Sequence, residues 1–83
     1  MPETSTTTKV IAETIRKHME HRGISQSQMG KFLNRSQSYV QTRFHGEQAW
    51  TTDDIDALAK IFGLTNGFAL IDEARGINRH PRT

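Results

Sequence analysis

The sequence predicts an all-α fold, a compact bundle of four or five short helices. Apolar residues recur three and four positions apart, which is the periodicity of amphipathic helices, and no segment shows the strict alternation of a strand. Ser and Thr, which begin helices, and Gly and Asn, which end them, separate the periodic segments. With 83 residues, the chain has the length of one domain.

The first helix is predicted over residues 9–22. Thr8 is the expected N-cap, and Gly23 stands where a left-handed residue would end the helix. The apolar face of this helix consists of Ile11, Ile15 and Met19. Residues 1–8 are rich in Ser and Thr and have no apolar periodicity, so we expect a disordered N-terminal tail.

Two helices of about eight residues each follow the first one. Ser25 and Gln28 have the spacing of a capping box, in which each side chain satisfies a backbone N–H at the start of the second helix. Asn34 can adopt the left-handed conformation that ends this helix. Ser36 is the expected cap of the third helix, and Gly46 closes it. The inward-facing residues of the two helices are Met29, Leu33, Val40 and Phe44.

The fourth helix is expected to begin after Thr51. Asp53 and Asp54 fall in its first turn, where the helix dipole favours negative charge. Gly63 followed by Leu64 indicates a Schellman ending with its hydrophobic contact. The inner face of this helix consists of Ile55, Leu58, Ala59 and Phe62.

The fifth helix is predicted over residues 66–75. Phe68 and Ile71 are expected to face inward, and Gly76 is expected to follow the helix. We interpret Trp50 and Phe68 as core residues that hold the last two helices on the bundle.

The domain is therefore expected over residues 9–75, with a basic C-terminal tail over residues 76–83. Its net charge is only +2, but the charge is unevenly distributed. Residues 21–46 contain no Asp or Glu, whereas residues 47–73 are rich in both. Such polarity suits a protein that presents one face to a polyanion, and the alternative is a chance distribution on solvated faces.

The most informative segment is residues 24–46, which contains the second and third helices. Because only residues 34–36 separate these helices, they must cross steeply, as in a helix-turn-helix. The outer face of the third helix has polar side chains without negative charge, which can reach base edges in a major groove. The alternative is an ordinary solvated helix face. The candidate base contacts are Gln37, Ser38, Gln41 and Thr42.

The segment resembles the XRE-like family of helix-turn-helix regulators, which includes lambdoid phage repressors and Cro proteins. The resemblance covers residues 15–64 and begins with Ile24, Ser25 and Gln26, followed by Met29 and Gly30 in the place of the family's Leu-Ala pair. It is strongest with short regulators of actinobacteria and their phages, in which RSQSYV is a familiar form. Further matching positions are Ser36, Val40, Gly46, Thr51, Leu58, Ala59, Phe62 and Gly63.

This resemblance implies a lambda-repressor-like fold and a sequence-specific transcriptional regulator, a phage repressor or Cro-like protein, that binds a double-stranded DNA operator. In the matching positions, Gln26 and Ser36 would contact the DNA backbone. The candidate phosphate contacts also include Lys31, Arg35 and Arg43, although each of these could be a solubilising charge instead.

The chain departs from the family pattern at three positions. Asn34 replaces the usual Gly of the turn, Arg35 replaces an apolar residue, and Phe44 replaces a Glu near the end of the third helix. We expect Arg35 to add a phosphate contact. We expect Phe44 to pack in the core and to release Arg43 toward DNA.

Several classes of function are disfavoured by the sequence. It has no cysteine, no nucleophile and base motif and no phosphate-binding loop, so we expect neither an enzyme nor a cofactor or small-molecule ligand. His18 and His21 lie three apart, but no third ligand stands at a suitable spacing, so we expect no metal site. No apolar run suits a membrane span or a signal peptide, which predicts a cytoplasmic protein.

Three questions are left open by the sequence. An antitoxin subunit or another interaction module is the alternative function, although the short, polar tail lacks an apolar extension for a toxin. A homodimer is the second open question, and it would use the fourth and fifth helices or the tail. Phe32 either shields the first helix or marks a partner surface.

Overall fold

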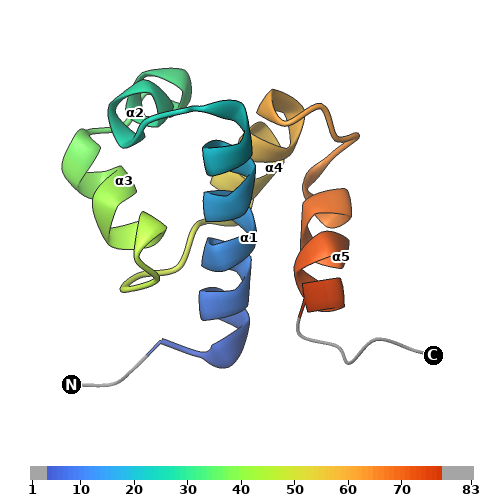
Figure 1. Cartoon of the computed structure of the whole chain (residues 1–83). Helices are drawn as coiled ribbons and strands as arrows, with labels where there is room; N and C mark the ends of the chain where they lie inside the picture. The colour runs from blue at the N-terminus through green and yellow to red at the C-terminus, as the bar shows by residue number, and fades with distance from the viewer. Residues whose placement is uncertain (1–3, 78–83) are drawn as a thin grey trace.

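The computed structural model describes residues 4–77, which form five α-helices and no strand (Figure 1). This confirms the predicted all-α bundle. None of the helices in this part of the chain is both long and apolar enough to cross a lipid bilayer. The helices are α1 (Thr6–Arg22), α2 (Gln26–Leu33), α3 (Gln37–Phe44), α4 (Thr52–Ile61) and α5 (Gly67–Ile77).

The starts of α2, α3 and α4 confirm the predicted caps Ser25, Ser36 and Thr51. Each of these side chains accepts a hydrogen bond from the backbone N–H three residues later. At α2 the capping box is complete, because the Gln28 side chain accepts from the Ser25 N–H at 2.8 Å. Local sequence therefore determines where these three helices begin.

The start of α1 differs from the prediction. Ser5, and not Thr8, is the N-cap, since its hydroxyl accepts from the Thr8 N–H at 3.1 Å. Thr6 to Thr8 thus belong to the helix, and the tail predicted over residues 1–8 is too long. The hydroxyl of Thr4 also donates to the Gly46 carbonyl at 2.7 Å, which ties this end of the chain to the end of α3. Residues 1–3 and 78–83 of the two predicted tails lie outside the described residues.

The first four helices all end in the same way, with one left-handed residue. The residue after it donates its N–H to a carbonyl five positions earlier, the bond that defines a Schellman motif. The predictions for Gly23, Asn34 and the end of α4 are confirmed by this geometry. The left-handed residues are Gly23, Asn34, Gly46 and Gly63, with φ of 67, 58, 77 and 81°.

The core lies between all five helices, and Trp50 is buried in it as predicted. Phe68 is the exception among the expected core residues, because 79% of it is exposed. The α5 helix begins at Gly67, with the Asn66 side chain accepting from the Phe68 and Ala69 N–H groups, and continues past Gly76. Leu70 and Ala74 therefore form its inner face.

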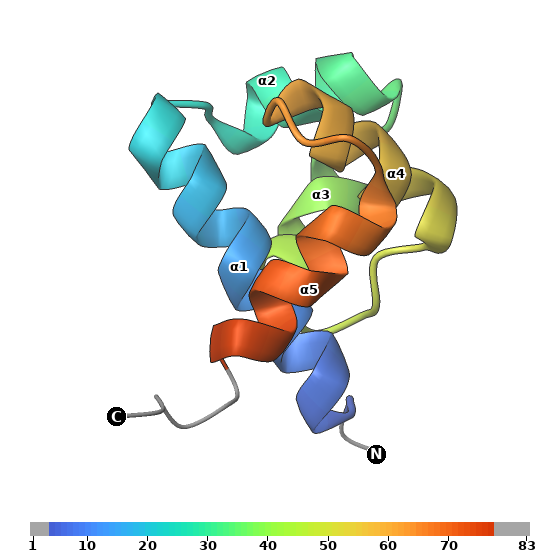
Figure 2. The ribbon, with the colours of Figure 1, turned by 90° about the vertical axis from the view of Figure 1, so that its right-hand side faces the viewer.

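Helix α1 lies at the centre, with α3 on one side of it and α5 on the other (Figures 1 and 2). Two arginines of α1 fix the ends of its neighbours. Arg16 donates to the Phe44 carbonyl of α3 at 3.0 Å, and Arg22 donates to the Phe62 carbonyl of α4 at 2.8 Å. A positive charge at a helix C-terminus also interacts favourably with the helix dipole. These contacts hold the ends of α3 and α4 against α1.

Candidate nucleic-acid interface

The second and third helices form a close helix-turn-helix, in which α2 and α3 cross steeply (Figure 1). Gly30 of α2 lies directly against the turn. A Cβ atom at this position would come within 2.8 Å of the Arg35 carbonyl oxygen, closer than packed atoms tolerate. The Arg35 N–H also donates to the Gly30 carbonyl at 2.8 Å. The missing side chain at Gly30 thus lets the turn pack on α2 and determines how α3 leaves it.

Three of the four predicted base contacts share an exposed face of α3. Gln37, Ser38 and Gln41 are all exposed. Gln41 lies four residues after Gln37 and three after Ser38, so it is a neighbour of both on the helix surface. Thr42 is half-buried, and its hydroxyl lies 3.1 and 3.3 Å from the carbonyl oxygens of Tyr39 and Ser38. The Thr42 proton is therefore used inside the helix, which leaves the three exposed side chains as the main polar surface.

Behind this surface, two arginines lie against the Tyr39 ring of α3. The Arg35 guanidinium carbon is 4.6 Å from the centre of the ring, and that of Arg43 is 3.6 Å from it. The Tyr39 hydroxyl donates to Asp54 in the first turn of α4, and Arg35 pairs with the same carboxylate at 3.5 Å. We call Arg35, Tyr39, Arg43 and Asp54 the tyrosine cluster.

The tyrosine cluster accounts for a buried charge. Asp54 is only 3% exposed, and a buried carboxylate is costly unless it is paired and hydrogen-bonded. The Tyr39 hydroxyl and the Arg35 guanidinium supply these partners. Burial and the hydrogen bond to Asp54 raise the pKa of Tyr39 above its ordinary value. The cluster therefore links α3 to α4 through a neutral phenol and a charged pair.

Tyr39 and Asp54 were not among the residues expected at this site. The sequence indicates for Asp54 only a favourable interaction with the dipole of α4, and it indicates no role for Tyr39. Fifteen positions separate the two residues, and no local pattern indicates that their side chains meet. Arg35 stands four residues before Tyr39 and Arg43 four residues after it, and this spacing is the signal that could have indicated a ring stacked on arginine.

The predicted backbone contacts occupy different environments. Lys31 is exposed and Gln26 half-buried on α2, while the Ser36 oxygen accepts from the Tyr39 N–H and keeps its proton available. Arg43 folds back along α3, where it donates to the Tyr39 carbonyl at 3.2 Å. Arg35 is shared between the ring and Asp54. Contacts of these five side chains with phosphates stay predictions.

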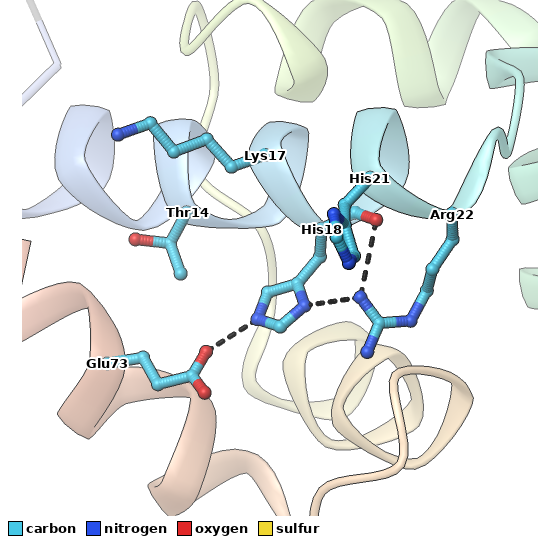
Figure 3. Close-up of a pocket in the computed structure, with 6 residues that line it drawn as sticks. All are labelled: Thr14, Lys17, His18, His21, Arg22 and Glu73. Carbon is cyan, nitrogen blue, oxygen red and sulfur yellow. Dashed lines mark hydrogen bonds and ion pairs between the residues drawn. The ribbon is translucent and has the colours of Figure 1, made fainter.

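A second polar cluster lies between α1 and α5, away from the helix-turn-helix (Figure 3). His18 has partners at both ring nitrogens, Glu73 at 2.5 Å from Nε2 and Arg22 at 2.7 Å from Nδ1, and its ring stacks on Phe62. The cluster links α1, α4 and α5. Residues 4–77 contain no group of three His, Cys, Asp or Glu side chains placed to hold a metal ion.

Comparison with known proteins identifies one family. The model of the BetR domain matches residues 6–82, nearly the whole chain. No curated protein and no solved structure shows significant similarity to it. The BetR domain is a helix-turn-helix type of DNA-binding domain found in transcriptional regulation, and it is not catalytic. The all-helical fold agrees with this match, and the chain belongs to the BetR domain family.

Proposed function

We propose that this protein regulates transcription by binding a specific double-stranded DNA operator with α3 in the major groove. The observation that carries the proposal is the exposed face of α3, where Gln37, Ser38 and Gln41 present amide and hydroxyl groups without a carboxylate. Such groups can pair with the donors and acceptors of base edges. The family match independently supports DNA as the ligand.

The side chains around α3 would then hold the DNA backbone. Ser36 and Gln26 lie at the starts of α3 and α2, where helix N-termini favour phosphate groups. Lys31 and Arg35 add positive charge, and Arg43 would have to leave the carbonyl of Tyr39 to reach a phosphate. Thr42 would accept, rather than donate, a hydrogen bond at a base edge.

A phage repressor or Cro-like protein is the finer form of this proposal. It is supported by the resemblance to XRE-like regulators over residues 15–64. When bound to its operator, the protein would block or recruit the polymerase. Such a regulator acts where the DNA is, in the cytoplasm on the nucleoid. A homodimer would read two half-sites about 34 Å apart on one face of the duplex.

Selection from random duplexes tests the proposed function. We expect the whole chain to enrich one DNA motif, and the double variant Gln37→Ala and Gln41→Ala to lose that enrichment. Gln48→Ala is the matched control, because Gln48 is an exposed glutamine in the loop after α3. Failure of the natural chain to enrich any motif, or enrichment of the same motif by the double variant, would overturn the proposal.

A further inference from the structure

The carboxylate of Asp54 contacts the helix-turn-helix, although Asp54 belongs to α4. The N-cap of α4 is Thr51, whose hydroxyl accepts from the Asp54 backbone N–H at 3.0 Å. This cap is complete without the Asp54 side chain. The two carboxylate oxygens instead accept from the Tyr39 hydroxyl, at Oδ2, and from the Arg35 guanidinium, at Oδ1. Both partners belong to α3 and the turn before it.

Arg35 is held at both ends by these contacts. Its backbone N–H donates to the Gly30 carbonyl at 2.8 Å, and its guanidinium carbon lies 4.6 Å from the centre of the Tyr39 ring. The contact with Asp54 uses only one terminal nitrogen, Nη2, at 3.5 Å. A guanidinium has five N–H donors, and 41% of the Arg35 side chain is exposed. Arg35 is therefore fixed in place and still has donors for a phosphate.

We propose that Asp54 is a positioning residue for DNA binding, which holds the Arg35 guanidinium ready for a backbone phosphate. The inference rests on the proposed function. Asp54 is only 3% exposed, so it cannot reach DNA itself and acts through Arg35. A long side chain that must be ordered on binding lowers affinity, and one that is held in advance avoids this cost. Asp54 thus strengthens the binding of a polyanion although it carries a negative charge.

Charge alone predicts the opposite sign. Removal of a carboxylate from a protein that binds a polyanion normally strengthens binding, because the net attraction rises. Removal of a residue that positions a phosphate-binding arginine weakens it. Asn has the shape of Asp but only one oxygen and no charge, so it cannot hold both Tyr39 and Arg35 as the carboxylate does. Asp54→Asn therefore separates the two effects.

Binding of the whole chain to the selected duplex and to a scrambled one tests the proposal. We expect Asp54→Asn to weaken binding to both duplexes by about three- to tenfold, as for one long side chain released from its fixed position. Asp53→Asn is the matched control, because Asp53 is exposed, lies in the same helical turn and loses the same charge. It should bind as tightly as the natural chain or more tightly.

A double variant shows whether Asp54 acts through Arg35. In a chain that already carries Arg35→Ala, Asp54→Asn should weaken binding no further, since the arginine that it positions is gone. A natural chain that binds no duplex would overturn the proposed function and this inference with it. If the natural chain binds, an Asp54→Asn variant that binds as tightly, or one that weakens the Arg35→Ala chain equally, overturns the positioning role alone.

The natural chain supplies a second measurement, which does not depend on the folding of a variant. Nuclear magnetic resonance relaxation of the arginine Nε–H groups reports how strongly each side chain is ordered. Arg75 is the matched control, because its side chain lies on α5, is 62% exposed and pairs with Asp72 at 3.2 Å. We expect Arg35 to be more ordered than Arg75 without DNA. An Arg35 side chain as mobile as that of Arg75 would overturn the proposal.

Discussion

Tyr39 of α3 donates its hydroxyl proton to the buried carboxylate of Asp54, at the start of α4. The bond joins the proposed DNA-reading element to α4, whose Ile55, Leu58 and Ala59 are buried in the core. Because the guanidinium groups of Arg35 and Arg43 both lie against the Tyr39 ring, the same contact also holds two of the proposed phosphate-binding side chains near α3.

The first prediction concerns the stability of this contact. Tyr39→Phe keeps the ring that both arginines contact but removes the hydroxyl, so Asp54 loses its closest partner. We expect a decrease of about 1–3 kcal/mol in the free energy of unfolding, the usual cost of a buried group left without its hydrogen bond. Urea unfolding followed by circular dichroism measures it. An unchanged free energy would mean that Asp54 does not depend on Tyr39.

The second prediction concerns pH. The pKa of Tyr39 is raised in the folded protein above its ordinary value of 10.0, so the folded state keeps the phenol proton longer than the unfolded chain does. The contribution of Tyr39 to stability is therefore complete below about pH 10 and is lost as the pH rises through the folded pKa.

The difference in unfolding free energy between the natural chain and Tyr39→Phe should thus shrink when the pH is raised from about 8 to about 11. Comparison of the two chains removes the effect of the lysines, which titrate in the same range. A difference that stays constant over this range would contradict the raised pKa.

The third prediction concerns Gly30. Replacement of a helical glycine by alanine normally stabilises a helix by up to about 1 kcal/mol. At Gly30 the new methyl group would lie 2.8 Å from the Arg35 carbonyl, a backbone atom that can move only with the turn. We therefore expect Gly30→Ala to lower the free energy of unfolding by about 1–3 kcal/mol.

Gly76→Ala is the matched control for Gly30→Ala. It also lies within a helix, α5, but a Cβ atom there would meet nothing within 4 Å. Its free energy of unfolding should stay the same or rise slightly. Equal stability of the two alanine variants would contradict the close packing of the turn against Gly30.

The positions of helix starts and ends could be predicted from the sequence because they depend on local interactions. The capping box of Ser25 and Gln28, the left-handed Asn34 and the cap Thr51 each use atoms within a few residues of one another. The start of α1 could not be predicted in this way. Ser5 and Thr8 are both suitable N-caps, and only the structure shows that the Ser5 hydroxyl caps the start of the helix.

Contacts between residues far apart in the chain could not be predicted from the sequence. Phe68 was expected in the core on hydrophobicity alone, but the register of α5 turns it outward and places Leu70 and Ala74 inside. The face of α3 was predicted correctly as polar and exposed for Gln37, Ser38 and Gln41. The Tyr39 contact with Asp54 depends on how α3 and α4 pack, which no single segment of the sequence specifies.

Binding of two variants to matched duplexes separates the proposed roles of Gln37 and Arg35. A side-chain amide on a base edge discriminates among base pairs, while a guanidinium near a phosphate acts through its charge on any sequence. Both variants should first be shown to fold by circular dichroism, since Arg35 also pairs with Asp54.

The most direct measurement is the affinity of Gln37→Ala and Arg35→Ala for the selected duplex and a scrambled one at two salt concentrations. We expect Gln37→Ala to lose about 1–3 kcal/mol on the selected duplex and almost nothing on the scrambled one. Arg35→Ala should weaken both duplexes equally and reduce the salt slope by about one. Equal weakening of both duplexes by Gln37→Ala would contradict the claim that this face of α3 reads the operator.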